Sequence, residues 1–173
     1  VELERIAVID TKSCNNLNFY ASLRFLDKTT IGDDFAIIRD ADTKSKEMVE
    51  RNLSNQLKSN INDKFDAKAI SLLYITKYSS IEGFLFSPEL LVSHGLYNKV
   101  EDVYEDLHKK LTDKKQKFIN YFEDQNKGDT DRIDLFKSDY DSKIVDVKGN
   151  LDWIKTYIKG HDYFNPTKAK CIS

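Results

Sequence analysis

The sequence predicts an α/β domain in which a mostly parallel sheet is flanked by helices, with a helical insert in the second half. Two observations predict this class. In the first half, short apolar runs alternate with segments of helical periodicity, an order typical of a parallel sheet with helices on its faces. In the second half, long amphipathic stretches replace the strand-like runs, as expected of packed helices.

The elements of the first half follow in the order strand, helix, strand, helix, strand. Apolar runs at 5–10 (RIAVID), 34–40 (DFAIIRD) and 69–78 (AISLLYITKY) predict the strands. Apolar residues recur at helical spacing in 15–26 and 44–61, between these runs. Because ligands of such sheets bind outside the carboxyl ends of the strands, we expect the polar residues after each run to meet at one edge.

The second half begins with a short helix. Ser87 followed by Pro88 predicts its start, and Gly95 predicts its end nearby. Residues 99–126 then predict a long amphipathic helix, or a pair of helices with a break in the segment TDKKQK.

The last part of the chain gives a mixed signal. The segment 127–150 is polar, and its structure stays open at this point. Residues 151–159 predict a final helix, and Gly160 is predicted to close it.

Composition limits the classes of function. The chain has 173 residues, 40% of them hydrophobic and 12% aromatic, which suits one compact domain with its own core. The net charge of -2 leaves no polybasic arm, so nucleic-acid binding would need metal ions or a local basic face. Neither a P-loop nor a dinucleotide-binding glycine motif is present, and no apolar run approaches the about 20 residues of a membrane span.

The cysteines indicate the compartment. Cys14 and Cys171 lie far apart and form neither a zinc spacing nor a disulfide framework. A reducing, cytoplasmic setting is therefore the expectation.

The first chemical signal is the stretch AIIRDAD, in which Asp40 and Asp42 end the second predicted strand. Two carboxylates two residues apart on an irregular turn can both reach one hard cation such as Mg²⁺. The alternative is a solvated turn whose aspartates cap the following helix.

The second signal is Glu82 in the stretch YSSIEGFLF. A glutamate inside an apolar segment is either paired or directed toward a functional site. The alternative is an exposed glutamate in the first turn of a helix. Ser80 either adds a hydroxyl ligand or caps that helix.

Two further residues complete the candidate site. Asp10 follows the first predicted strand, and Lys159 follows the last predicted helix. The alternative for Asp10 is an ordinary strand-end residue in a turn. Lys159 either counters the C-terminal dipole of its helix or neutralises a phosphate. His161 is the histidine that merits testing, since His94 and His108 share no metal-ligand spacing with it and His108 is expected at the surface.

Together these motifs resemble a Toprim domain, and more narrowly the Toprim nuclease of the OLD (overcoming lysogenisation defect) family and its relatives in Gabija-like and retron-associated ATPase–Toprim phage-defence proteins. The resemblance covers residues 5–86 and 151–162. It implies a Toprim α/β core, then a helical insert, then a C-terminal helix and tail that complete the module. The corresponding ranges are 1–98, 99–146 and 147–173.

The resemblance implies a nuclease that uses two Mg²⁺ or Mn²⁺ ions. Asp40 and Asp42 match the D-x-D motif of the family, Ser80 and Glu82 match its S-x-E motif, and Lys159 matches its late lysine. The implied catalytic residues are Asp40, Asp42, Glu82 and Lys159. The implied metal ligands are Asp10, Asp40, Asp42, Ser80 and Glu82.

One motif departs from the family pattern. Where the family has V-E-G-x-x-D after its first strand, this chain has VIDTKSC, so that Asp10, Thr11 and Cys14 replace the glutamate, the glycine and the second acid. An aspartate side chain is shorter by one methylene, and a thiol is a poor Mg²⁺ ligand. The segment DKTTIGD also leaves little room for the extra strand that is usual there.

The resemblance also implies partners. The substrate would be DNA or RNA, an ABC-type ATPase domain would lie in the same or a partner chain, and homo-oligomers are expected, without a membrane. Because the chain begins with Val1, we expect it to be a fragment of a longer ATPase–nuclease.

Three alternatives stay open. A degenerate Toprim domain would no longer cleave, and would serve nucleic-acid binding, partner binding or oligomerisation. A Toprim domain of another class, such as a primase, topoisomerase or RNA-maturation nuclease, fits less well with the S-x-E-G element and the helical insert. A receiver-like domain would need a later lysine on a strand, whereas Lys159 follows a predicted helix.

Overall fold

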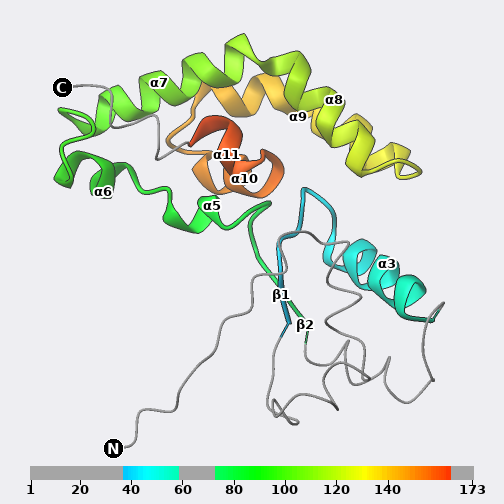
Figure 1. Ribbon diagram of the computed structural model, residues 1–173. Helices are drawn as coiled ribbons and strands as arrows, with labels where there is room; N and C mark the ends of the chain where they lie inside the picture. The colour runs from blue at the N-terminus through cyan, green and yellow to red at the C-terminus, as the bar shows by residue number, and fades with distance from the viewer. Residues whose placement is uncertain (1–36, 59–72, 165–173) are drawn as a thin grey trace, which may run out of the picture. The chain divides into compact units, whose positions relative to one another are not determined.

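The computed structural model describes residues 37–58 and 73–164 (Figure 1). The described fold is α/β and mostly helical, with a small parallel sheet of two strands. The predicted strand 5–10 and helix 15–26 lie outside the described residues. So do Asp10, Thr11, Cys14 and Cys171.

The chain divides into two compact units. The first comprises residues 1–39 and 50–74, and the second comprises residues 40–49 and 75–173. Every described residue of the candidate site belongs to the second unit.

The two described strands lie within the runs that predicted them. Strand β1 is Ile37–Arg39 and strand β2 is Leu73–Ile75, and the two are hydrogen-bonded neighbours. Helix α3, Lys46–Lys58, lies within the predicted helix 44–61. Its first turn is capped by Ser45, whose Oγ accepts a hydrogen bond from the N–H of Met48 at 3.2 Å.

The second unit is built of helices that pack on one another. Helices α7, α8 and α9 form one group, in which α9 contacts both of the others (Figure 1). Helix α10 packs on α9 and α5, α11 packs on α7 and α5, and α6 packs on α7. Their bounds are α5 Glu82–Leu85, α6 Pro88–Ser93, α7 Val100–Asp113, α8 Lys115–Gln125, α9 Thr130–Val145, α10 Leu151–Tyr157 and α11 Gly160–Tyr163.

Local signals in the sequence placed several helix ends correctly. The Oγ of Ser87 accepts a hydrogen bond from the N–H of Leu90 at 3.4 Å, and Pro88 opens α6. Gly95 follows α6 with φ 71°. Of the two alternatives for 99–126, the structure contains the pair of helices, because α7 and α8 are separated at Lys114 within TDKKQK.

The segment 127–150, left open by the sequence, contains the longest helix of the described chain, α9. Asp129 caps it by accepting a hydrogen bond from the N–H of Arg132 at 3.2 Å. Its buried residues recur at helical spacing, so packing of this face stabilises a segment rich in aspartate. They are Phe136, Tyr140 and Ile144.

The prediction that Gly160 closes the last helix is wrong. Helix α10 ends at Tyr157, Ile158 is extended, and Gly160 instead begins the short helix α11. The physical requirement for glycine here is close packing against Ser80 and Glu82 rather than a left-handed helix end.

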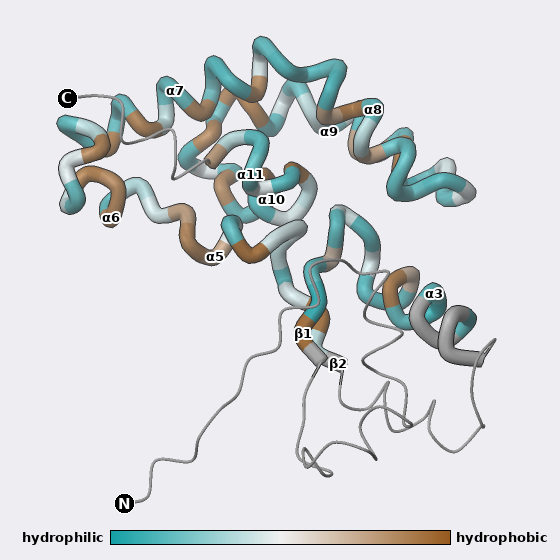
Figure 2. Tube along the Cα trace, in the orientation of Figure 1, coloured by the Kyte–Doolittle hydropathy of each residue, from teal (hydrophilic) through white to brown (hydrophobic). Residues whose placement is uncertain are grey.

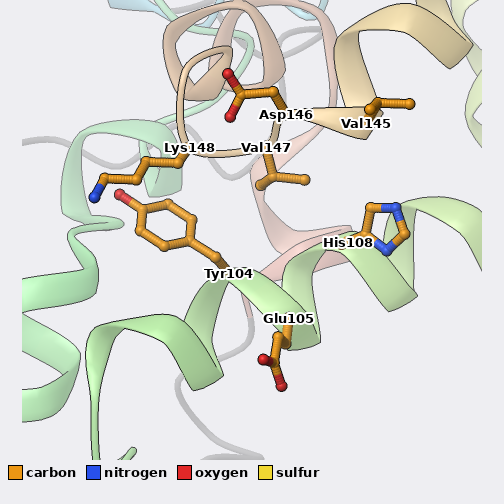
Figure 3. Close-up of a pocket in the computed structure, with 7 residues that line it drawn as sticks. All are labelled: Tyr104, Glu105, His108, Val145, Asp146, Val147 and Lys148. Atoms are coloured by element: carbon orange, nitrogen blue, oxygen red, sulfur yellow. The ribbon is translucent and has the colours of Figure 1, made fainter.

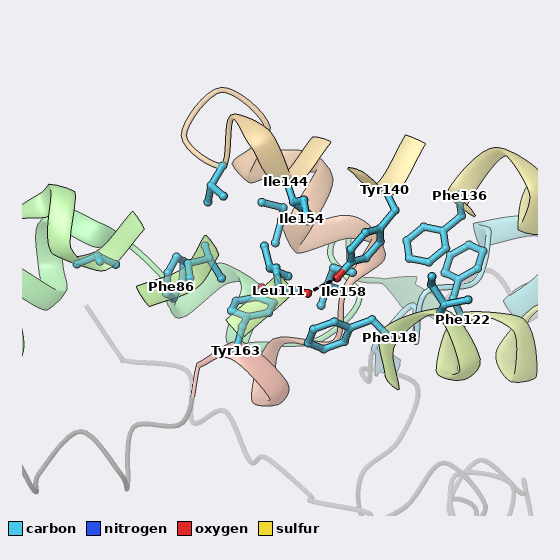
Figure 4. Packing of buried hydrophobic residues seen from close by; sticks show 14 of the residues in the cluster. Phe86, Leu111, Phe118, Phe122, Phe136, Tyr140, Ile144, Ile154, Ile158 and Tyr163 are labelled. Atoms are coloured by element: carbon cyan, nitrogen blue, oxygen red, sulfur yellow. Dashed lines mark hydrogen bonds between the residues drawn. The ribbon is translucent and has the colours of Figure 1, made fainter. Parts of the chain in front are cut away.

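One hydrophobic core contains buried residues from each of the helices α6 through α11 (Figure 4). The ring of Phe136 stacks between Phe122, at a centroid distance of 4.0 Å, and Trp153, at 5.5 Å. The buried hydroxyl of Tyr140 donates to the carbonyl of Leu111 at 2.9 Å, so the core contains a satisfied polar group. This core fixes the helices that carry the candidate site.

The hydropathy of the helices is mixed along their length (Figure 2). In α7, apolar residues alternate with polar ones, and the apolar positions Val103, Leu107 and Leu111 are buried. No helix in the described ranges has the length and apolar character needed to cross a membrane.

Candidate functional site

Three segments that are far apart in the sequence are tied together in the second unit. The N–H of Asp42 donates to the carbonyl of Ser79 at 3.0 Å, and the N–H of Ser79 donates to the carbonyl of Lys155 at 3.0 Å. The N–H of Gly160 donates to the Oγ of Ser80 at 2.9 Å. The segments that carry Asp42, Ser80 and Gly160 therefore meet, as the sequence predicted for the residues that follow its second and third strands.

Asp40 is half-buried in this cluster. Burial, followed by the charges of Asp42 and Glu82, raises its pKa from 3.8 to about 6. The charge of Lys159 and a hydrogen bond from the backbone of Ile81 oppose this rise. Negative charge is thus crowded around Asp40, and with a pKa of about 6 its charge changes near neutral pH.

The segment after β1 forms a tight turn with an unusual backbone. The N–H of Lys44 donates to the carbonyl of Ala41 at 2.9 Å, and the two central residues, Asp42 and Thr43, have φ of 51° and 65°. Two left-handed central residues are the mark of a type I′ turn, where Asn-Gly is favoured. A β-branched threonine in this region costs on the order of 1–3 kcal/mol. Neighbouring residues must therefore hold this turn.

The hydroxyl of Thr76 also supports this turn. The Oγ1 of Thr76 accepts a hydrogen bond from the N–H of Ala41 at 3.3 Å and donates one to the carbonyl of Tyr78 at 2.8 Å. Thr76 and Ser79 are both buried. The hydroxyl of Ser79 also donates to the carbonyl of Ile158, so the segment after β2 is anchored on the end of α10.

Ser80, Glu82 and Gly160 are in close contact. Ser80 is 2% exposed, and its Oγ already accepts the bond from Gly160. A Cβ added to Gly160 would lie 2.5 Å from the Oγ of Ser80 and 2.7 Å from the Cβ of Glu82, so only glycine fits. The observed role of Ser80 is to hold this junction, and its role as a metal ligand stays a prediction.

Lys159 reaches the acidic cluster from the junction of α10 and α11. Its Nζ lies 3.8 Å from the Oδ1 of Asp42 and 3.3 Å from the hydroxyl of Tyr121, whose ring it also faces at 5.1 Å. Burial lowers the pKa of Lys159, but the hydrogen bond to Tyr121 and the nearby negative charges outweigh it, so the net shift is upward. Lys159 is therefore a permanent cation at this site.

Tyr163 brings a buried hydroxyl near the same cluster. Tyr163 is 3% exposed, and its hydroxyl has no hydrogen-bond partner in the part of the chain that the structure describes. Burial, and then the charges of Glu82 and Tyr78, raise its pKa. The hydroxyl therefore stays protonated and can act only as a neutral donor or acceptor.

The chemistry of the cluster fits a hard divalent cation. Asp40, Asp42 and Glu82 supply carboxylate oxygens, which Mg²⁺ and Mn²⁺ prefer. Burial and the charges of Asp42 and Glu82 raise the pKa of Asp40, and Lys159 offsets part of this rise. Among the described residues, no three His, Cys, Asp or Glu side chains are already gathered as a metal-binding group. Binding would therefore draw the three carboxylates closer together.

Comparisons with known proteins assign no family to this chain. No family model, curated protein or solved structure matches the chain. The interpretation of the site consequently depends on its residues and their geometry.

All three histidines, His94, His108 and His161, are exposed. His161 is exposed, and its Nε2 is 3.9 Å from the Oδ2 of its neighbour Asp162. His108 is exposed, as predicted, and lines a shallow hollow between α7 and the segment that follows α9 (Figure 3). That hollow holds none of the predicted site residues. Its lining is Tyr104, Glu105, His108, Val145, Asp146, Val147 and Lys148.

Sequence reasoning missed the residues that support the site from the helices. Tyr121 lies on α8, Asn126 follows that helix, and Arg132 lies in the first turn of α9. Each contacts a site segment that is more than 35 residues away in sequence, as the separations of 38, 83 and 89 residues show. No local motif marks such contacts, so only the folded chain reveals them.

Proposed function

We propose that this chain is a metal-dependent endonuclease module of the Toprim type that cleaves or nicks DNA. In this proposal it is the C-terminal effector part of an OLD-like ATPase–nuclease that acts in anti-phage defence in the cytoplasm, as a homo-oligomer. The observation that carries the proposal is the junction of the D-x-D turn, the S-x-E segment and the Lys159–Gly160 turn. Those are the segments whose motifs resemble the family.

The carboxylates would hold the metal ions. Asp40 would help to hold both ions, Asp42 and Asp10 would help to hold one of them, and Glu82 and Ser80 the other. When bound, paired divalent ions supply a clamp for the scissile phosphate, an activated water and stabilisation of the leaving oxygen. The half-buried position of Asp40 and the charges beside it support its central place in this assignment.

Lys159 would act on the substrate phosphate. Its ammonium is 3.8 Å from the Oδ1 of Asp42, so it already faces the acidic cluster. A fixed cation at this position would offset the charge that develops on the phosphate in the transition state. Tyr121 fixes the direction of the ammonium by accepting its hydrogen bond.

Plasmid nicking by the full chain with Mg²⁺ or Mn²⁺ tests this function. We expect nicking that EDTA abolishes and that Asp40→Ala and Glu82→Ala each remove. Asp134→Ala is the matched control, because Asp134 is exposed on α9 and outside the cluster. Nicking that survives both site substitutions would refute the assignment.

A degenerate, binding-only Toprim domain is the second candidate. Two observations favour it: Lys159 partly compensates Asp42, and no three described His, Cys, Asp or Glu side chains are gathered as a metal-binding group. DNA binding that is measured by gel shift in Ca²⁺, with no nicking in Mn²⁺ or Mg²⁺, would favour this candidate over the nuclease.

A further inference from the structure

The strained turn at 41–44 receives three hydrogen bonds from a distant part of the chain, one of them from the Nδ2 of Asn126 to the Oγ1 of Thr43 at 3.5 Å. The carbonyl of Thr43 accepts a bond from the Nη2 of Arg132 at 3.0 Å and one from the Nδ2 of Asn126 at 3.4 Å. Thr43 itself is 1% exposed. The peptide that follows the left-handed Thr43 is thus held from outside the turn.

The two donors are themselves fixed in place. Asn126 is fully buried, its Oδ1 accepts from the Nε of Arg132 at 3.2 Å, and its Nδ2 also donates to the carbonyl of Phe122 at 2.9 Å. The guanidinium of Arg132 lies over the rings of Phe122 and Tyr157, at 5.6 Å and 5.3 Å from their centroids. Donors with so little freedom can impose a conformation on the group that they bind.

Such support is needed because Thr43 does not favour its own conformation. A left-handed backbone suits glycine or asparagine, whereas a β-branched side chain disfavours it. Without its donors the turn would relax, and the carboxylate of Asp42, directly before Thr43, would change direction. The orientation of Asp42 would therefore depend on Asn126, which follows α8, and on Arg132 of α9.

From these contacts we infer that Asn126 and Arg132 are positioning residues for Asp42, which set the affinity of the acidic cluster for a divalent cation. This inference rests on the proposed function and extends it into the segment 99–146, where the resemblance offers no motif. Groups that orient metal ligands typically change metal affinity by about 10–100-fold when they are replaced.

Mn²⁺ binding, followed by the loss of the free Mn²⁺ signal in electron paramagnetic resonance, tests the inference without any need for catalysis. We expect Arg132→Lys to raise the Kd for Mn²⁺ by about tenfold. Lysine keeps the positive charge. It cannot reproduce the two hydrogen bonds that the planar guanidinium donates at once, to the carbonyl of Thr43 and to the Oδ1 of Asn126. If Arg132→Lys does not fold, Asn126→Ala provides the same comparison. We expect a smaller increase in the Kd for Mn²⁺, because the hydrogen bond from Asn126 to the carbonyl of Thr43 is longer than that from Arg132.

Two further variants separate positioning from general stability. Ile144→Val removes a methyl group from the core beneath α9, so it should lower the thermal midpoint without changing the Kd for Mn²⁺. Thr43→Gly should rescue Arg132→Lys, because glycine adopts the left-handed turn without outside support. In that background Arg132→Lys should raise the Kd by less than about threefold.

The outcomes distinguish this inference from the proposed function. Wild-type protein that binds no Mn²⁺ would overturn both. Wild-type protein that binds Mn²⁺ with the same Kd as folded Arg132→Lys and Asn126→Ala would overturn the positioning role alone. An equal loss of affinity in Ile144→Val, or no rescue by Thr43→Gly, would also contradict it, because the effect would then reflect stability.

Discussion

The backbone N–H of Asp42 donates to the carbonyl of Ser79 across 3.0 Å. This bond joins the turn after β1 to the segment after β2, and so brings the D-x-D carboxylates toward Glu82. Ser79 in turn donates hydrogen bonds to the carbonyls of Lys155, on α10, and of Ile158, which follows that helix and precedes Lys159. The hydrogen bonds of one buried serine, Ser79, thus connect the three segments of the candidate site.

Asp40→Asn should stabilise the metal-free protein at about pH 7.5. The pKa of Asp40 is about 6 in the folded chain against an ordinary value of 3.8, so its ionisation opposes folding. The stability associated with protonated Asp40 is fully present below 3.8 and is lost as the pH rises through 6. Thermal unfolding should therefore show a higher midpoint for the variant near neutral pH and no difference near pH 3.8.

Asp134→Asn is the control for that comparison, since Asp134 is exposed on α9. Its midpoint should differ little from that of the wild type at either pH. Equal midpoints for Asp40→Asn and wild type near neutral pH would contradict the crowding of carboxylates around Asp40.

Mn²⁺ should stabilise the protein more strongly at about pH 7.5 than at about pH 5. Protons compete with the ion for Asp40, whose pKa of about 6 lies between these conditions. The rise in thermal midpoint at a fixed Mn²⁺ concentration, recorded at both pH values, measures this competition. An equal rise at both would exclude Asp40 as the ligand that controls binding.

Lys159→Met should separate metal binding from cleavage. The affinity for Mn²⁺ should be kept or slightly increased, because a cation near Asp42 is removed. The nicking rate at saturating Mn²⁺ should fall by about a hundredfold, the cost of losing one fixed charge-stabilising group. Lys148→Met, at an exposed position outside the cluster, is the matched control. A large loss of Mn²⁺ affinity with an unchanged rate would reverse the proposed role.

Gly160→Ala should destabilise the fold by about 1–3 kcal/mol, as overpacking commonly does, and weaken Mn²⁺ binding. The new methyl group would press on Ser80 and Glu82, at 2.5 and 2.7 Å, so these segments must separate. Gly149→Ala is the control, since the three atoms nearest to its added Cβ belong to the carboxylate of the exposed Asp146, which can move. Denaturant unfolding and Mn²⁺ titration of both variants provide the measurement, and equal effects would argue against a specific junction at Gly160.

The sequence predicted those parts of the fold that have local signals. Ser87, Pro88 and Gly95 bounded α6 correctly, because capping and turn chemistry act over a few residues. Helix α9 stayed open because aspartates mask its apolar stripe, and tertiary packing of Phe136 and Tyr140 stabilises it instead.

The candidate site was predicted less completely. The meeting of Asp42 with the segment at Ser79 follows from the expected strand order, and the structure contains it. Gly160 was misread, because its close contact with Ser80 and Glu82 is invisible at short range. Arg132 carries no motif either, since its effect on Thr43 depends on a fold that joins residues 89 positions apart.

The most direct test of the central claim is to count the Mn²⁺ ions that the full chain binds near neutral pH, beside Asp40→Asn and Asp134→Asn. If the carboxylates that meet at Ser79 form a metal centre, the wild type and Asp134→Asn will bind Mn²⁺ saturably, with two ions per chain. Asp40→Asn will lose this binding. The same stoichiometry and affinity in Asp40→Asn would contradict the claim, because the cluster would then not be where the metal binds.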